Sequence, residues 1–279
     1  MRFKSLIAAA ALCAASPAWA QDPAPLPSPE EINSADSFTI AAGGAIIPDY
    51  EGSDDYRLIP AGALRGRVHG ISFTTRGLYL YVDVVPDKGN LGFDAGPIVG
   101  LRFNRTGKIK DDFVNRLPDR KTAVEVGGFV GVSAKGLTNP YDTLAFRLDV
   151  VKDVASAHQS TIFTPNVEFT TPLSRSFYVG TSLSADFVSN RFADYYFTIS
   201  PADALASGLP AFNANGGMKD WKLGMLANYA LSGDLRHGVS VFGTGTYSRL
   251  VGDFKRSPIV SDRGSASQWL GAVGLAYSF

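Results

Sequence analysis

Apolar side chains alternate with small or polar ones along most of this chain, and the alternation continues to its last residue. In the closing stretch LGAVGLAYSF the bulky apolar residues are Val273, Leu275, Tyr277 and Phe279, and the residues between them are small or polar. Successive side chains of a β-strand point to opposite faces, so this stretch predicts a strand with one apolar face. The same period of two recurs in segment after segment from residue 37 onward.

The alternating segments predict about twelve antiparallel strands. Many of the segments have ten or more residues, whereas soluble strands usually have about 5–6 and tilted strands that cross a bilayer need about 9–11. An even number of strands places both termini on one side, as in bacterial single-chain barrels. We expect strands at 38–47, 57–67, 72–84, 91–103, 122–133, 141–151, 159–171, 176–187, 192–199, 218–231, 239–249 and 267–279.

A closed barrel is the architecture that such strands favour. No run of ~18 uncharged apolar residues follows residue 20, so helical membrane spans are not expected. In hydrocarbon every backbone N–H and C=O group must be paired within the protein, and a closed antiparallel barrel does this because it has no edge strand. The sequence therefore predicts an all-β fold, a closed antiparallel transmembrane β-barrel with apolar side chains toward lipid. The alternative is a water-soluble lipocalin-like barrel or sandwich, with the apolar face inside.

The first twenty residues have the three-part composition of a secretory signal peptide. Two basic residues, Arg2 and Lys4, precede an apolar run over 6–15 and a small-residue cleavage motif at 18–20. Export followed by barrel formation predicts a location in the outer membrane of a Gram-negative cell. We expect a signal peptide at 1–20, a disordered or extended N-terminal arm at 21–36 and the barrel at 37–279.

Removal of the signal peptide would leave a nearly neutral chain without cysteine. The whole sequence has 26 basic and 26 acidic residues, and residues 1–20 hold two of the basic ones and the single cysteine, Cys13. The remaining 24 basic and 26 acidic residues give a net charge of −2, which is not typical of a nucleic-acid partner. Neither a disulfide nor a cysteine-based metal site is then expected, and the sequence predicts no cofactor.

Three stretches carry recognisable motifs. They are GGAIIPDYEGSDDYRLIPAGALRGR from Gly43, LPDRKTAVEVGGFVGV from Leu117 and SNRFADYYFTISPADALASGLPAFNANGG from Ser189. With the final strand, they resemble the MipA/OmpV family, which includes the MltA-interacting scaffold protein, over essentially all of the chain after residue 20. The sequence departs from the family pattern at Thr198, where Gly is expected. The P-x-Y-x-G-S…P motif of the family corresponds to Pro48, Tyr50, Gly52, Ser53 and Pro60.

The resemblance implies a non-enzymatic outer-membrane β-barrel. One member is described as a scaffold that joins a murein-degrading lytic transglycosylase to a murein synthase, and others resemble adhesins or permeability proteins. We therefore expect a scaffold that links the outer membrane to periplasmic murein-remodelling enzymes, with a narrow channel, permeability factor or adhesin as the alternative. The final strand, with Val273, Leu275, Tyr277 and Phe279, also resembles the signal that the outer-membrane assembly machinery recognises. Its other expected partner is outer-membrane lipid.

The segment 104–121 does not fit the expected topology. If the termini are periplasmic, the alternation of connections places this segment on the periplasmic side, where turns are normally short. Either the strand count is wrong by one hairpin, or the segment is a docking surface for an acidic partner or for murein carboxylates. Charge runs, however, usually lie on solvated surface. Its basic residues are Arg105, Lys108, Lys110, Arg116, Arg120 and Lys121.

A possible catalytic pair is His158 with Ser160. These residues resemble the H-x-S pair of barrel lipid-A deacylases, and Glu168 would then be the acid that orients the histidine. A two-residue motif matches easily by chance, and catalytic triads are recognised by geometry. We therefore expect no catalytic residue, and a deacylase-like enzyme is a remote alternative.

The loop at 48–56 holds four acidic residues whose carboxylates could bind a divalent cation. The spacing of an EF-hand is missing, so a solvated acidic loop is the simpler interpretation and no metal site is predicted. Twelve strands enclose a lumen smaller than that of a 16–18-stranded porin. Inward aromatic residues are expected to fill or narrow it, namely Tyr79, Tyr81, Phe129, Tyr178 and Phe242.

Overall fold

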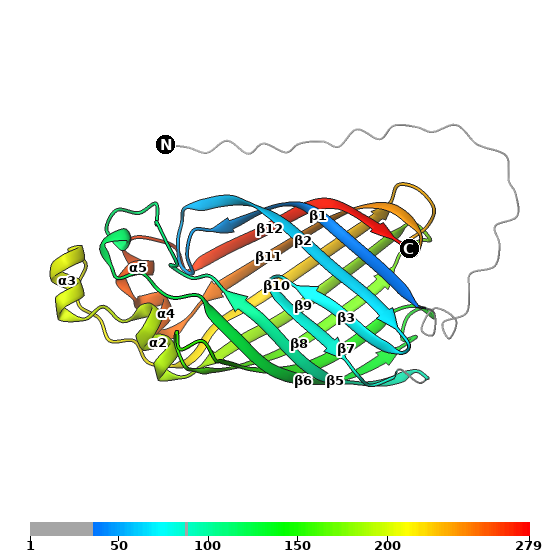
Figure 1. Cartoon of the computed structure of the whole chain (residues 1–279), viewed down its shortest axis with the longest axis horizontal. Coiled ribbons are helices and arrows are strands. Elements are labelled where there is room, and N and C mark those ends of the chain that lie inside the picture. The colour runs from blue at the N-terminus through cyan, green and yellow to red at the C-terminus, as the bar shows by residue number, and fades with distance from the viewer. Residues whose placement is uncertain (1–35, 87–88) are drawn as a thin grey trace, which may run out of the picture.

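The strands of the chain close into a single antiparallel barrel (Figure 1). A computed structural model describes residues 36–86 and 89–279; within these ranges twelve strands are found, and each pairs with its neighbours in sequence. The last strand, β12, pairs with β1 from Thr39↔Ser278 to Ile46↔Gly271 and closes the cylinder. The predicted fold is confirmed. The predicted signal peptide and most of the N-terminal arm lie outside the described residues.

Most strands are long enough to cross a bilayer when tilted. In residues 36–86 and 89–279, helices lie only in the connections. The elements are β1 (Ser37–Pro48), β2 (Tyr56–Val68), β3 (Ile71–Arg76), β4 (Tyr79–Asp83), β5 (Leu91–Arg102), η1 (Val114–Arg116), β6 (Ala123–Lys135), β7 (Thr143–Asp153), β8 (Thr161–Pro172), β9 (Phe177–Val188), α2 (Asn190–Phe197), α3 (Pro201–Ser207), β10 (Gly217–Ala230), β11 (Gly238–Leu250), α4 (Gly252–Arg256), α5 (Pro258–Ser261) and β12 (Ser267–Ser278).

Two of the expected strands were wrong, and the two errors cancel in the count. The segment 72–84 is a hairpin, β3 and β4, which turns at Gly77 with a φ of +58°. The segment 192–199 belongs mostly to helix α2, because its apolar residues recur at a helical spacing of three to four. The residues on the buried face of α2 are Phe192, Ala193, Tyr196 and Phe197.

The outer wall of the barrel is apolar, as predicted for contact with lipid. Large side chains on the outward parity of the strands remain exposed, whereas such side chains are normally buried in a soluble domain. Trp221, Tyr247 and Trp269 adjoin one another near the non-terminal end, with ring centroids 5.4 and 4.9 Å apart, as in an interfacial aromatic girdle. Other exposed outward residues are Leu91, Phe93, Val130, Leu183, Met225, Val273, Leu275 and Tyr277.

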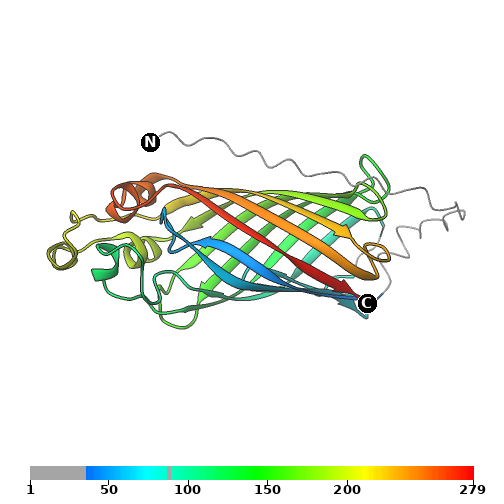
Figure 2. The ribbon, with the colours of Figure 1, turned by 90° about the horizontal axis from the view of Figure 1, so that it is seen from above.

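The two ends of the barrel carry different connections (Figure 2). Both described termini lie at one end, where Phe279 N donates to Phe38 O over 2.9 Å. The connections at this end are 69–70, 84–90, 136–142, 173–176 and 231–237, and those at the other end are 49–55, 77–78, 103–122, 154–160, 189–216 and 251–266. Bacterial barrels have short periplasmic turns and longer extracellular loops. The terminal end is therefore periplasmic, and the opposite end, here called the loop end, is extracellular.

This topology corrects the expected position of segment 104–121. Because 72–84 is a hairpin, every connection from 85–90 to 188–191 changes ends, and 104–121 lies at the loop end with 49–55 and 251–266. The long segment thus obeys the rule for extracellular loops. Of the two explanations that the sequence left open, an error of one hairpin in the strand count is therefore the correct one.

Among the described residues, no helix is long and apolar enough to cross a membrane. The helices instead join the long loops in a compact cap over the loop end, seen at the left of Figure 1. Residues from four connections pack into this cap and bury their side chains almost completely. Its core includes Tyr50, Ile109, Val114, Leu117, Phe192, Tyr196, Phe197, Leu209, Phe254, Ile259 and Val260.

Candidate functional site

The family-motif loop fixes the cap to the barrel. Tyr50 is 2% exposed, and its hydroxyl donates to the carbonyl oxygens of Ile259 at 2.9 Å and Arg263 at 3.1 Å. Burial, and secondarily the nearby Asp111, raises the pKa of Tyr50, so the hydroxyl remains a donor. The tyrosine of the motif therefore ties connection 49–55 to connection 251–266.

The other motif residues also have structural roles. Gly52 has a φ of +105°, and a Cβ atom there would lie 2.4 Å from Cγ2 of Val260. Ser53 is 1% exposed, and its carbonyl accepts from Nε2 of Gln268 at 2.8 Å. Pro48 ends β1, and Pro60 lies within β2. Through Gly52 and Ser53 the motif therefore packs connection 49–55 against connection 251–266 and the start of β12.

Helix α2 lies across the loop end of the lumen. The ring of Phe192, which is fully buried, has the guanidinium of Arg102 and the ammonium of Lys219 each 5.4 Å from its centroid. Arg102 is on β5 and Lys219 is on β10, so one aromatic ring contacts cations from both sides of the barrel. Thr198 ends this helix, and its Oγ1 accepts from Ala214 N at 3.0 Å, a contact that a glycine would lack.

A buried ion-pair network lies directly beneath α2. On one wall, Nε of Arg102 is 2.7 Å from Oε1 of Glu125, which is fully buried on β6. Glu125 also accepts from Tyr79 OH, and its Oε1 is 3.0 Å from Nε2 of His158. The carboxylate of Glu125 is thus surrounded by donors, as a buried charge requires.

The opposite wall holds the second half of the network. Nζ of Lys219 lies 3.2 Å from Oδ2 of Asp186 and 3.3 Å from Oδ2 of Asp220, and Lys222 also pairs with Asp186. Lys219 and Asp220 are adjacent in sequence yet both are buried, because a register shift between Met218 and Asp220 opposes two residues to one. Such a bulge re-aims side chains locally.

Glu51 joins the two halves. Its Oε1 is 2.6 Å from Nη1 of Arg102, and its Oε2 is 3.2 Å from Nζ of Lys219. Burial opposes ionisation of Glu51, but Lys219 and Arg102 outweigh it and hold the pKa of the carboxyl below its usual value. One loop carboxylate therefore connects β5 to β10 across the mouth of the lumen.

Further charges line the lumen farther from the cap. Arg147 pairs with Asp149 at 2.6 Å, and Tyr81 donates to the same aspartate at 2.9 Å. Arg76 pairs with Glu168 at 2.6 Å. Of the predicted aromatic filling, Tyr79 and Tyr81 turn inward to these carboxylates. The sequence pattern did not indicate the network. Arg102, Glu125 and Asp186 lie on the small and polar parity of their strands, but Glu51 belongs to a loop and Lys219 turns inward only through the bulge in β10.

The His158–Ser160 pair does not have the geometry of a catalytic triad. The carboxylate at His158 is Glu125, whereas Glu168, the expected acid, pairs with Arg76. His158 Nδ1 accepts from the backbone N–H of Ser160 at 3.2 Å, and Ser160 Oγ is instead 2.6 Å from Ser189 Oγ. Both ring nitrogens of His158 are therefore occupied by other groups than the serine hydroxyl.

The cations of 104–121 do not form one exposed surface. Arg105 is 3% exposed, and its guanidinium donates to the carbonyl oxygen of Tyr196 at 3.1 Å. Burial, and secondarily Arg120, lowers the pKa of Arg105 to about 10. Lys108, Lys110, Arg116 and Lys121 are exposed, but Nζ of Lys110 already donates to the carbonyl oxygen of Tyr56. Docking by this segment stays a prediction, and a partner would have to approach from the loop end.

Two other expectations concern acids and the final strand. Within 36–86 and 89–279, no group of three or more His, Cys, Asp or Glu side chains is placed to hold a metal ion; Asp49 and Glu51 instead bind protein groups. Val273 and Phe279 are 62% and 60% exposed on the outer face. Recognition of this strand by the assembly machinery stays a prediction.

The chain is similar in structure to several solved outer-membrane proteins. Among solved structures, the chain is similar to the NanC porin, with 10% identity over 86% of this chain and 98% of that chain and a TM-score of 0.46. It is also similar to an outer membrane channel from Pseudomonas putida F1, with 9% identity over 94% and 100% of the two chains and a TM-score of 0.45. The outer membrane channel DcaP of Acinetobacter baumannii has 9% identity over 87% of this chain and 96% of that chain, with a TM-score of 0.36.

Two further comparisons use the sequence alone. A search of curated proteins gives no significant match. The profile of one protein family, described as MltA-interacting protein MipA, matches residues 40–279, which is the whole described barrel except its first residues. With its closed barrel and apolar outer wall, the chain is an outer-membrane β-barrel protein that belongs to the MltA-interacting protein MipA family.

Proposed function

We propose that this protein is a non-enzymatic scaffold that holds a murein-remodelling enzyme, such as a lytic transglycosylase, at the inner surface of the outer membrane. The observation that carries the proposal is the family match over residues 40–279, since the family is described by its interaction with MltA. The barrel supplies the anchor, because a closed sheet with an apolar wall is stable in lipid.

The state of the lumen supports a scaffold over an open pore. Glu51 connects Arg102 and Lys219 on different walls, and the ring of Phe192 lies over both cations. Opening a path there would break both ion pairs of Glu51, at a cost of about 2–3 kcal/mol, because Arg102 and Lys219 each keep another carboxylate.

A docking surface for a periplasmic enzyme would lie at the terminal end. Two turns at this end, 173–176 and 231–237, are joined by a hydrogen bond of 3.2 Å from Leu235 N to Arg175 O. They leave Leu173 and Leu231 61% and 57% exposed. These two leucines on adjoining turns would give a partner an apolar contact at the terminal end.

Site-specific photocrosslinking in cells tests the proposal. A photoreactive amino acid replaces Leu173 or Leu231 at the terminal end, and Leu205, which is 90% exposed on α3, in the matched control. We expect crosslinks to a murein-cleaving or murein-synthesising enzyme from the first two positions and none from position 205. If neither terminal-end position gave crosslinks to such an enzyme, the proposal would be contradicted.

A narrow channel is the alternative, and the charged lining of the lumen favours it. Arg147, Asp149, Arg76 and Glu168 would suit ions or a small charged solute if the mouth opened. The channel would be supported by steady single-channel conductance of the purified protein in planar bilayers. This conductance should persist when residues at the terminal end are changed.

A further inference from the structure

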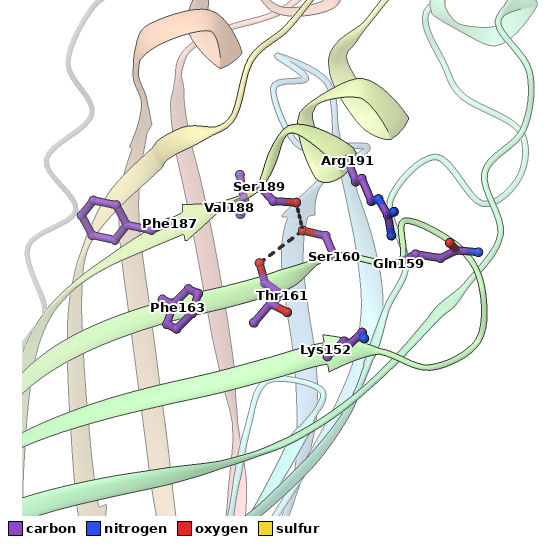
Figure 3. A pocket seen from close by; sticks show the side chains of 9 residues that line it. All are labelled: Lys152, Gln159, Ser160, Thr161, Phe163, Phe187, Val188, Ser189 and Arg191. Carbon is purple, nitrogen blue, oxygen red and sulfur yellow. Dashed lines mark hydrogen bonds between the residues drawn. The ribbon is translucent and has the colours of Figure 1, made fainter.

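A pocket of about 420 Å³ opens on the outside of the barrel, where β8 and β9 reach the loop end (Figure 3). The register places Lys152 opposite Thr161 and Phe163 opposite Phe187. These residues share the outward parity of their strands, and the two phenylalanines are 47% and 39% exposed. The pocket therefore faces the membrane and is separate from the ion-pair network in the lumen.

The lining of this outer pocket is divided by chemistry. Figure 3 shows Arg191, Gln159 and Lys152 on one side, and Phe163 and Phe187 on the other. The polar side is nearest the loop, and the aromatic side continues onto the lipid-facing wall. A ligand that fits would have an anionic group joined to an apolar group.

The two cations of the pocket are available to a ligand. Among the described residues, no carboxylate lies within ion-pair distance of Lys152 or Arg191, whereas Arg102, Arg147 and Lys219 in the lumen each pair with at least one. The carboxylate next in sequence, Asp153, is occupied by the backbone N–H groups of Ala155 and Gln159 at 2.9 Å each. Asp194 lines the adjoining hollow with Arg191 but makes no ion pair with it.

Local bonds hold the pocket in shape. Ser160 Oγ lies 2.6 Å from Ser189 Oγ, which joins the start of β8 to the segment that leads from β9 into α2. Gln159 has a φ of +52°, a left-handed conformation that is uncommon outside glycine, and its backbone N–H is fixed by Asp153. The side chains of Gln159 and Arg191 thus start from a defined backbone.

The depth of the pocket indicates which ligand it meets. Trp221, part of the aromatic girdle, pairs with Ala185, two residues before Phe187 on β9. Tryptophan and tyrosine girdles lie at headgroup level, so the pocket lies at the level of the outer-leaflet headgroups. We propose that it binds a phosphorylated lipid of the outer leaflet, with the phosphate between Lys152 and Arg191 and an acyl chain along Phe163 and Phe187.

Binding of lipid A by the purified full chain in detergent tests this assignment. The test variant is K152Q/R191Q, and the control K108Q/K255Q removes the same two charges from exposed positions at the same end. Diphosphoryl lipid A, its dephosphorylated counterpart and inorganic phosphate are the three probes. Native mass spectrometry reports bound lipid, and the mobility shift of the unheated protein in gels confirms the folded barrel.

We expect diphosphoryl lipid A to bind K152Q/R191Q at least about tenfold more weakly than the unaltered protein, since each charge-assisted hydrogen bond contributes on that order. The control should bind as the unaltered protein does, and dephosphorylated lipid A should bind both weakly. Equal affinity of all three proteins, or equal loss in the control, would overturn the site. Competition by inorganic phosphate at the same concentration as lipid A would show a free-anion site and overturn the lipid assignment.

Discussion

Oε1 of Glu51 lies 2.6 Å from Nη1 of Arg102, so a residue of the first extracellular loop is bound to the wall of the barrel inside the lumen. The same carboxylate reaches Lys219 on β10. A loop that is held from both sides cannot leave the mouth without breaking two ion pairs. The family-motif loop is therefore tied across the mouth of the lumen from both sides.

Replacing Glu51→Gln is expected to lower the free energy of unfolding by about 2–3 kcal/mol. The value is below the usual 3–5 kcal/mol for a broken buried pair because Arg102 and Lys219 each keep another carboxylate. Urea unfolding followed by tryptophan fluorescence measures it. Asp54→Asn, in the same loop and exposed, is the control and should change the value by less than about 0.5 kcal/mol. Equal effects of the two changes would contradict the role of Glu51.

Tyr50→Phe is expected to loosen connection 251–266 while the barrel stays intact. The change removes the hydroxyl that donates to Ile259 O and Arg263 O, and it leaves those carbonyls without this partner, at a cost of about 1–2 kcal/mol. Limited proteolysis should cleave 251–266 faster than in the unaltered protein. Tyr229→Phe, on an exposed side chain, should leave the cleavage rate unchanged; if both variants are cleaved alike, the hydroxyl does not hold the loop.

Gly52→Ala separates backbone strain from steric overlap. The alanine would have a positive φ and a Cβ 2.4 Å from Val260 Cγ2, whereas Gly70→Ala has a φ of +83° with open space around it. We expect about 1 kcal/mol of destabilisation at Gly70 and about 2–4 kcal/mol at Gly52. Adding Val260→Ala should recover part of the loss at Gly52. No recovery would show that the overlap is not the cause.

Acid should weaken the contact between connections 103–122 and 251–266. Asp111 accepts from Arg263 at 2.6 Å and from Val114 N at 2.9 Å. Burial opposes its ionisation, but these donors outweigh it and lower the pKa of Asp111 below 3.8. A carboxyl with a lowered folded-state pKa contributes stability above its unfolded pKa and loses it as the pH falls through the folded value. The contact should therefore be unaffected between pH 7 and 5 and loosen below about pH 4.

Spin labels on Asp112→Cys and Ser261→Cys measure this separation. The protein used lacks residues 1–20, which contain the only other cysteine. We expect one short distance at pH 7 and a broader distribution at the lowest pH at which the barrel stays folded. With Asp111→Asn added, the distribution should already be broad at pH 7 and change little with acid. A distance that is narrow at both pH values in both proteins would refute the ion-pair argument.

Segment 104–121 should be accessible from outside the cell. We expect Lys108→Cys to react with a membrane-impermeant maleimide in intact cells, because its connection lies at the loop end. Ser174→Cys, at the terminal end, should react only after the outer membrane is permeabilised. The opposite pattern would reverse the assigned orientation of the barrel and, with it, the position of the proposed docking turns.

The fold class and the outward face follow from the sequence alone. Alternation is a local property that follows from the geometry of each strand, so the lipid-facing residues from Leu91 to Phe93 and from Val273 to Tyr277 were predicted in the correct orientation. The motif residues of 48–60 were found by resemblance, but their purpose, the joint with Gln268 and Ile259, depends on residues more than two hundred positions away.

The ends at which the connections lie and the charges that meet depend on the three-dimensional arrangement of the whole barrel. A hairpin at Gly77 and a helix at 190–197 alter the topology without changing the period or the strand count. The partners Glu51, Arg102 and Lys219 come from a loop and two strands far apart in the chain. Alternation specifies which face a side chain occupies, but ring closure and register specify its neighbours on that face, and these are set by the whole barrel at once.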